Sequence, residues 1–488
     1  MGRRQDAPGR PRENFRAWTL AGPVLNILHT MQATTSDSKA SGAPIAILGV
    51  PFDGVNLDET LALAGEMIAT RRPHYVTTVG VDFLAEALED VELRRILFDA
   101  HLVVAEDKTV VWASKMLGNP LPASVAIPGF IPRLLAQAEQ KGWRVFLLGG
   151  GDDVAEKIRA RHPKLQLVGA YLPPDKPLLE MDQADILRRL REAKPDILLV
   201  AFGSPKQEKW INMNYRESRV PFVLGAGVTF DFLTGTGRPQ KRTRKNFWKF
   251  VRAVLWQWWR LRAKKKTAPP GKPVVMPDPY GNIVIRSPAQ LGATAAQAAQ
   301  DEWLRAVEKG NVIFDLADTV FVDSTGIGSL IRLRKRSREL GYQFFLVAPR
   351  PQVSAALKLM KLDEFFTIQA SLSGVRILME SAAGAAPVTS DVQEKELQIR
   401  WAGEVTALNA VELGAYTESE LSQITPGMNV VIDLSRVTFV DSTGIGLLVR
   451  FKKNLKRSDV NLRFVNASGS VRNVIQQTQL EEFLLAGN

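Results

Sequence analysis

The sequence contains no cysteine and only four histidines among its 488 residues. Without cysteine there is no disulfide, no thiolate zinc site and no cysteine nucleophile, and this composition fits a reducing compartment. Because no two histidines are spaced as i and i+4, the sequence also predicts no metal site and no metal cofactor. The histidines are His29, His74, His101 and His162.

Long apolar runs are missing as well. No run of about 18 apolar residues occurs, so the sequence predicts no transmembrane helix, and its first residues, MGRRQDAPGRPREN, lack the apolar stretch of a signal peptide. A hydrophobic share of 45%, a charged share of 23% and a mean hydropathy of −0.06 exclude collagen-like, wholly disordered and multi-span membrane proteins. The length leaves room for about three domains.

The net charge of +12 comes from one segment. Residues 238–266 carry twelve Lys and Arg residues and no Asp or Glu, whereas basic and acidic residues are equal in number over the rest of the chain. Phenylalanine and tryptophan recur in this segment at helical spacing, which predicts an interfacial helix on an anionic membrane surface. A helix docked on the core is the alternative, and we expect no nucleic-acid partner. The candidate membrane or acceptor contacts are Arg238, Arg242, Arg244, Trp248, Arg252, Trp256, Trp258, Trp259 and Arg260.

Short apolar runs alternate with amphipathic patterns between residues 43 and 237. Their hydrophobicity is continuous rather than alternating, which indicates strands buried on both faces of a parallel sheet. We therefore expect an α/β protein, with a Rossmann-like, mostly parallel sheet domain followed by two small α/β domains. The predicted strands are 45–50, 74–79, 102–105, 144–150, 166–171, 196–202 and 221–227.

The C-terminal part of the chain repeats itself. Residues 312–335 match residues 430–453 at a constant offset of 118 residues, which indicates two copies of one domain. In each copy an apolar strand leads to Asp-Ser-Thr-Gly, a sequence that caps an amphipathic helix. The predicted boundaries are a flexible leader at 1–42, the Rossmann-like domain at 43–237, the basic appendage at 238–266, a linker at 267–281, the first copy at 282–380, a linker at 381–391 and the second copy at 392–488.

The two copies resemble the STAS domain of anti-sigma-factor antagonists and stressosome subunits. In that family the Asp-Ser-Ser/Thr-Gly loop docks a partner serine kinase, whose target is the second hydroxyl. The resemblance implies phosphorylation at Thr325 and Thr443, with Ser324 and Ser442 as alternatives, and a serine/threonine kinase or an anti-sigma factor as partner. A phosphate there would lie at a helix start beside the capping aspartate and add local repulsion. A non-phosphorylated interaction or small-ligand sensor stays open.

Polar and glycine-rich loops follow several predicted strands, at the carboxyl edge where ligands of open α/β sheets bind. GSPKQEKW (203–210), GAGVTFDFLTG (225–235), ILGVPFDGVNLDE (47–59) and VVWASKMLG (110–118) together resemble the WecG/TagA/CpsF family of glycosyltransferases. The resemblance implies a UDP-sugar donor held by these loops, although Gly149, Gly150 and Asp231 could equally be turn and cap residues. The implied donor-binding residues are Gly149, Gly150, Gly203, Ser204, Pro205, Lys206, Gln207, Glu208 and Asp231.

That family moves an N-acetylhexosamine-type sugar from UDP onto a polyprenyl-diphosphate-linked acceptor without an obligatory metal. The resemblance therefore implies an enzyme of surface or exopolysaccharide synthesis, peripheral on the cytoplasmic face of the cell membrane and regulated through its STAS domains. An oligomer is compatible with the sequence.

Three motifs depart from the family pattern. Thr78-Val79-Gly80 lacks the family's Asn, Glu106-Asp107 stands in place of its Asp-Gly, and residues 126–129 lack a polar cluster. Glu106 or Asp107 would be the base that deprotonates the acceptor hydroxyl, with Thr78 as a further catalytic residue. The alternative is an inactive transferase fold that serves as a membrane-tethered signalling platform.

Overall fold

The computed structural model holds three bodies of secondary structure after residue 43, and the predicted leader at 1–42 lies outside the described residues. We refer to residues 44–262 as the Rossmann-like domain, to 274–375 as the first repeat domain and to 388–485 as the second repeat domain. The structure describes residues 44–149, 152–227, 230, 244–262, 274–278, 281–363, 365–375, 379, 388–393, 396–407, 409–421, 424, 428–457 and 460–485.

The Rossmann-like domain is built on six parallel strands in the order β4-β3-β8-β7-β5-β6. Successive side chains enter two different cores, as in β7, where Leu198 packs into one core and Leu199 into the other. Helices α2, α6 and α7 contribute to one core, and α3, α4, α8, α9 and α11 to the other. The sheet is therefore buried on both faces, as the continuous apolar runs predict.

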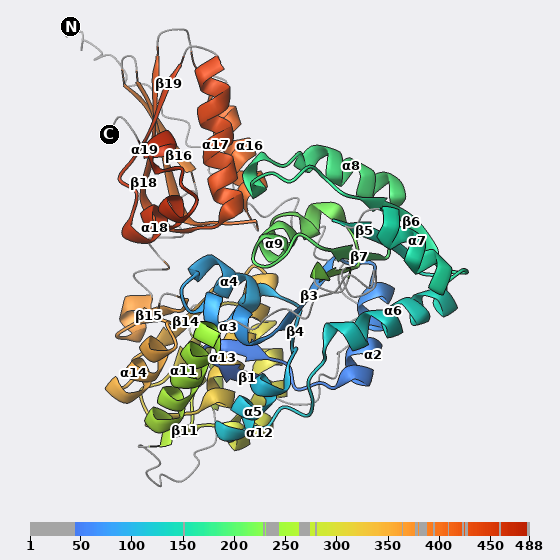
Figure 1. The fold of residues 1–488 in the computed structure, drawn as a ribbon. Helices are drawn as coiled ribbons and strands as arrows, with labels where there is room; N and C mark the ends of the chain where they lie inside the picture. The colour runs from blue at the N-terminus through green and yellow to red at the C-terminus, as the bar shows by residue number, and fades with distance from the viewer. Residues whose placement is uncertain are drawn as a thin grey trace, which may run out of the picture. The chain divides into compact units, whose positions relative to one another are not determined.

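The helices of this domain alternate with its strands along the chain (Figure 1). The elements are β1 (Ile45–Ile47), β2 (Val50–Phe52), α2 (Leu57–Ala69), β3 (His74–Val79), α3 (Val81–Ala87), α4 (Val91–Asp99), β4 (Leu102–Ala105), α5 (Lys108–Met116), α6 (Ile127–Lys141), β5 (Arg144–Leu148), α7 (Asp152–Arg161), β6 (Gln166–Tyr171), the 3-10 helix η1 (Leu178–Glu180), α8 (Gln183–Ala193), β7 (Ile197–Val200), α9 (Lys206–Ser218), β8 (Phe222–Gly225) and α11 (Arg244–Arg262).

One predicted strand is wrong. Residues 45–50 do not form a single strand of the parallel sheet, because the chain turns at Leu48 and Gly49, which have φ angles of 52° and 85°. The segment instead forms an antiparallel hairpin, with Ile45 opposite Phe52. Glycine accepts a positive φ without strain, so the turn was encoded in the sequence, but the apolar run concealed it.

The two repeat domains follow the same plan, with a sheet that is parallel apart from one antiparallel edge strand in each. Helix α13 (Ser324–Glu339) and helix α17 (Ser442–Arg457) differ by the same 118 residues at both ends, as do α14 (Pro351–Leu359) and α18 (Gly469–Gln477). The repeat read from the sequence is thus a repeat of structure.

The remaining elements complete the two sheets, whose strand orders are β15-β14-β12-β10-β9 and β16-β17-β18-β19. They are β9 (Val274–Pro277), β10 (Ile283–Arg286), β11 (Gln290–Leu291), α12 (Ala293–Val307), β12 (Val312–Asp315), β13 (Phe321–Val322), β14 (Phe344–Val347), β15 (Thr367–Gln369), β16 (Val388–Gln393), β17 (Glu396–Val405), α16 (Ala410–Leu421), β18 (Asn429–Val440), β19 (Asn461–Val465) and α19 (Glu481–Leu485).

Candidate functional site

The predicted catalytic residues lie at the carboxyl ends of two neighbouring strands, β3 and β4. The backbone N–H of Glu106 donates to the carbonyl of Val79 at 3.0 Å, so the loop after β4 lies against the end of β3. A Cβ added to Gly80 would lie 3.1 Å from Asp107 Oδ2 and 3.4 Å from Glu106 Oε2. Both carboxylates therefore face the residue that follows β3, two positions after the buried Thr78.

Asp107 is tied to the backbone of two helices. Its Oδ1 accepts hydrogen bonds from the N–H groups of Thr109 and Val110 at 2.9 and 3.2 Å, which caps α5. Its Oδ2 accepts from the N–H of Val81, at the start of α3, at 3.1 Å. Because protonation of Asp107 would weaken these three bonds, the geometry gives Asp107 a positioning role.

The second half of the site is the loop between β7 and α9 together with the first turn of α9. Gln207 and Glu208 are both buried, and Gln207 Nε2 donates to Glu208 Oε1 at 2.7 Å. The end of β8 and the chain after it pass close to Gln207. A Cβ added to Gly225 would lie 2.7 Å from Gln207 Nε2, and one added to Gly227 would lie 2.9 Å from Gln207 Oε1. These glycines allow the two loops to interlock around the Gln207 amide.

Glu208 has unusual protonation behaviour. Burial raises its pKa to about 7, although hydrogen bonds from Gln207 and Ser204 act in the opposite direction. Its Oε2 has no hydrogen-bond partner among the described residues. Near neutral pH this carboxyl can therefore exist in the protonated form and donate a hydrogen bond as well as accept one.

Residues 203–206, which form the end of the loop and the first residue of α9, lie nearer the surface. Gly203 and Ser204 are exposed, Pro205 and Lys206 are half-buried, and Gly203 has a φ of 76°. Lys206 Nζ lies 2.9 Å from Oδ1 of Asp175, whose side chain is fully exposed. The Lys206 ammonium therefore has an exchangeable ion-pair partner at the edge of the site.

The glycine run after β5 has a packing role. Gly149 has a φ of 94°, and an added Cβ would lie 2.4 Å from the carbonyl oxygen of Ala201. Its N–H donates to the carbonyl of Tyr171 at 2.8 Å. These contacts explain Gly149 without a ligand.

Four predicted site residues fall outside the described part of the chain, as do the side chains of Arg244 and Arg260. The four are Gly150, Asp231, Arg238 and Arg242.

Helix α11 has two different faces. Phe250 and Val254 are fully buried in the core of the Rossmann-like domain, where α11 packs against α3. The opposite face carries three tryptophans, which we call the outer tryptophans and which are between 46% and 66% exposed. Arg252 is also exposed, whereas Trp258 is half-buried and does not belong to this group. The outer tryptophans are Trp248, Trp256 and Trp259.

The helix is thus docked on the core and still presents an aromatic surface, so the two interpretations of the basic segment do not exclude each other. In the part of the chain that the structure describes, no helix is long and apolar enough to cross a bilayer.

The predicted phosphorylation sites are poorly accessible. Ser324, Thr325 and Ser442 are at most 3% exposed, and Thr443 is half-buried. The hydroxyl oxygens of Thr325 and Thr443 are buried and have no hydrogen-bond partner among the described residues. A kinase would need these loops to open first, so phosphorylation stays a prediction.

Helix α4 carries a set of buried charged residues that the sequence did not reveal. Glu92, Arg94 and Arg95 are buried there. Glu92 Oε2 lies 3.0 Å from Lys209 Nζ on α9, and Arg95 Nη2 donates to Glu404 Oε1 at 2.6 Å. No motif could have revealed them, because the partners of Glu92 and Arg95 are more than a hundred residues away along the chain. Among the described residues, no group of three or more histidine, aspartate or glutamate side chains could hold a metal ion.

Comparison with known families finds two kinds of domain in this chain. Residues 45–261 match the Glycosyl transferase WecG/TagA/CpsF family, and residues 274–374 and 386–487 match the STAS domain. The chain is 28% identical over 205 residues to the N-acetylglucosaminyldiphosphoundecaprenol N-acetyl-beta-D-mannosaminyltransferase of Bacillus subtilis (strain 168), covering 40% of this chain and 77% of the relative.

Two further similarities have lower identity. A protein of the same name from Staphylococcus aureus (strain NCTC 8325 / PS 47) is 23% identical over 207 residues, covering 41% of this chain and 80% of the relative. The solved structure of the anti-sigma factor antagonist SpoIIAA in its unphosphorylated form is 22% identical, covers 20% of this chain and 85% of that chain, and has a TM-score of 0.18. From the family matches, this chain joins a glycosyltransferase domain of the WecG/TagA/CpsF family to two STAS domains.

Proposed function

We propose that this protein transfers an N-acetylhexosamine-type sugar from a UDP donor to a polyprenyl-diphosphate-linked acceptor in surface or exopolysaccharide synthesis, and that its STAS domains regulate the transfer. The observation that carries the proposal is the meeting of two half-sites at one sheet edge. Strand β3 pairs with both β4 and β8, so the carboxylates after β4 and the interlocked loops after β7 and β8 share the carboxyl edge of the sheet. The names of the two relatives support the transfer of an N-acetylhexosamine and an acceptor linked to a polyprenyl diphosphate.

The proposed reaction is a direct displacement at the anomeric carbon. The acceptor hydroxyl gives its proton to the Glu106 carboxylate as its oxygen bonds to the anomeric carbon, and the bond from that carbon to the UDP oxygen breaks. Lys206 exchanges its exposed partner Asp175 for the diphosphate, and so stabilises the charge that develops on departing UDP. Asp107 holds the starts of α3 and α5 in place during the reaction.

We further propose that the enzyme works on the inner face of the cell membrane. The outer tryptophans and the basic residues around them form an aromatic, cationic surface of the kind that binds anionic bilayers. The same surface belongs to a helix that packs on α3, and Oδ2 of Asp107 accepts a hydrogen bond from the first N–H of α3. A lipid-linked acceptor held at the bilayer would thus come close to Glu106.

The decisive experiment measures UDP release from a panel of UDP-N-acetylhexosamines with a polyprenyl-diphosphate-sugar acceptor. Wild type is compared with Glu106→Gln, and with Glu156→Gln as a matched control at an exposed position on α7. We expect turnover by wild type and by the control, and a loss of at least about a hundredfold in Glu106→Gln, as is typical for removal of a general base.

Turnover that survives Glu106→Gln would refute the assignment of the base. Wild-type protein that binds a UDP-sugar but never releases UDP with any acceptor would refute the enzyme and favour a signalling platform on a transferase fold.

A further inference from the structure

The two repeat domains are attached to the Rossmann-like domain in different ways. The first shares an apolar core with it, in which Ala46 and Phe98 pack among the buried residues of the repeat. The Phe98 and Phe365 rings lie 4.1 Å apart between their centroids. Gln257 of α11 accepts from Leu48 N and donates to Ser324 Oγ. This attachment removes apolar surface from water and is that of a permanent structural unit.

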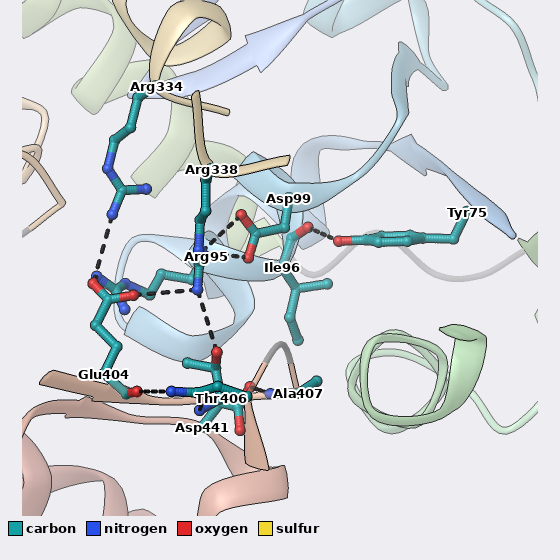
Figure 2. A network of polar contacts seen from close by, with 11 residues as sticks. Tyr75, Arg95, Ile96, Asp99, Arg334, Arg338, Glu404, Thr406, Ala407 and Asp441 are labelled. Carbon is teal, nitrogen blue, oxygen red and sulfur yellow. Dashed lines mark hydrogen bonds and ion pairs between the residues drawn. The ribbon is translucent and has the colours of Figure 1, made fainter. Parts of the chain in front are cut away.

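The second repeat domain is attached through a cluster of charged side chains, beside apolar contacts of Val91 and Leu179 with its core. Glu404, near the end of β17, accepts from Arg95 of the Rossmann-like domain at 2.6 Å and pairs with two arginines of the first repeat domain (Figure 2). Arg338 Nη2 lies 3.2 Å from Glu404 Oε2 and Arg334 Nη2 lies 3.6 Å from Glu404 Oε1. Arg338 also binds both carboxylate oxygens of Asp99 at 3.1 Å. We call these five residues the arginine junction.

The arginine junction depends on Glu404. Burial alone would raise the pKa of Glu404, but Arg95, Arg338 and Arg334 outweigh that effect and bring the pKa down to about 2. The Arg95 and Arg334 side chains are only 10% and 11% exposed. Without the Glu404 carboxylate, three guanidinium groups would share Asp99 as the one remaining anion of the junction. Removal of one partner from a buried ionic cluster is strongly destabilising, because uncompensated charge stays buried.

A second contact connects the same domain to the candidate donor site. The backbone N–H of Ser442, at the start of α17, donates to Glu92 Oε1 of α4. The other Glu92 oxygen lies 3.0 Å from Lys209 Nζ, which is also 2.8 Å from Asp90 Oδ2. Burial alone would lower the pKa of Lys209, but the two carboxylates outweigh it and hold the ammonium charged.

Lys209 lies on the first turn of α9, one residue after Glu208 and three after Lys206. The chain of contacts therefore runs from the second repeat domain through Glu92 to the helix that carries the candidate donor-binding residues. An α-helix transmits a displacement of its first turn along its axis because its backbone is hydrogen-bonded throughout.

We propose that the second repeat domain is a reversible clamp on the donor site: the arginine junction holds it docked, and its Ser442 N–H orients Glu92 and Lys209, which fix the start of α9. Glu92 and Lys209 are then positioning residues for the donor, and a partner that binds the Ser442 face must release the clamp. This inference rests on the proposed function, since it concerns donor binding.

Docking can be followed by Förster transfer in the full chain. The natural sequence has no cysteine, so Leu172→Cys and Val411→Cys, at positions 61% and 75% exposed, place two dyes on the Rossmann-like and second repeat domains. We expect Glu404→Gln to lower and broaden the transfer efficiency. The matched control is Glu396→Gln on the same strand, which removes an ion pair with Arg463 inside the second repeat domain.

Donor-site coupling is measured as UDP affinity by calorimetry on the same variants. We expect Glu404→Gln to weaken UDP binding about tenfold, equivalent to 1.4 kcal/mol, and Glu396→Gln to leave it unchanged. Ser442→Pro removes the N–H that binds Glu92 at a helix position that suits proline, whereas Ser442→Ala keeps it. Of the two Ser442 variants, only Ser442→Pro should lose affinity for UDP. Glu92→Gln, which neutralises the partner of Lys209, tests the same contact should Ser442→Pro fold poorly.

Three results would overturn the clamp. Unchanged transfer efficiency in Glu404→Gln would mean that the arginine junction does not hold the domain, and altered efficiency with wild-type UDP affinity would mean that docking does not reach α9. If wild type itself binds no UDP, the proposed function fails, and the clamp is then decided by hydrogen exchange. Loss of amide protection in α9 of Glu404→Gln supports the clamp, and unchanged protection refutes it.

Discussion

Truncation of Phe98 to alanine should destabilise two domains at once. Phe98 lies at the end of α4 and is 2% exposed, and its ring contacts Phe365 of the first repeat domain, which is 5% exposed. Replacing a buried phenylalanine by alanine costs about 3–5 kcal/mol, of which about 0.5–1.5 kcal/mol belongs to the aromatic pair. We therefore expect Phe98→Ala to lower the free energy of unfolding by about 4 kcal/mol.

The measurement is urea unfolding followed by tryptophan fluorescence. Trp210 in α9 and Trp303 in α12 are both fully buried, so each of the two domains contributes a reporter. Phe365→Ala and the double variant complete a thermodynamic cycle, in which we expect a coupling energy of about 1 kcal/mol. A loss below about 1 kcal/mol in Phe98→Ala, or single-variant losses that add within about 0.3 kcal/mol, would refute the shared core.

Three further outcomes follow from the charges and aromatic side chains. The pKa of Glu404 falls from 4.5 to about 2 in the folded state, so its stabilising contribution of about 3 kcal/mol is present above pH 4.5 and is lost as the pH falls toward 2. The difference in unfolding free energy between wild type and Glu404→Gln should therefore shrink from pH 7 to pH 3, and a constant difference would contradict this. The pKa of Glu208 is about 7, so raising the pH from 6 to 8 deprotonates it and places a negative charge beside the anionic donor. Donor affinity should therefore fall over this range in wild type but not in Glu208→Gln, and the same pH dependence of affinity in both proteins would rule this out. Changing the outer tryptophans together to alanine should abolish cosedimentation with anionic liposomes, whereas Trp112→Ala, at a 45% exposed position on α5, should not; equal binding by both would exclude α11 as the membrane contact.

Local sequence determined much of the fold. Six of the seven predicted strands are present in the parallel sheet, because each run is mostly apolar and can be recognised without knowing its partner strand. The offset of 118 residues predicted two copies of one domain, and helices α13 and α17 keep that offset at both ends. The loops of the candidate site also follow from the sequence, since parallel strands bring their carboxyl ends to one edge.

Tertiary structure decided what the sequence could not. Asp107 and Glu106 are adjacent and chemically alike, and only the folded chain shows that Asp107 accepts from three N–H groups at the starts of α3 and α5. The attachments of the repeat domains were equally hidden, because the contact of Glu92 with Ser442 spans 350 residues of the chain. Such pairs leave no period or motif in the sequence. In the sequence a charged residue such as Glu92 is equally compatible with an exposed helix face, and only the folded chain brings it to its partner away from water.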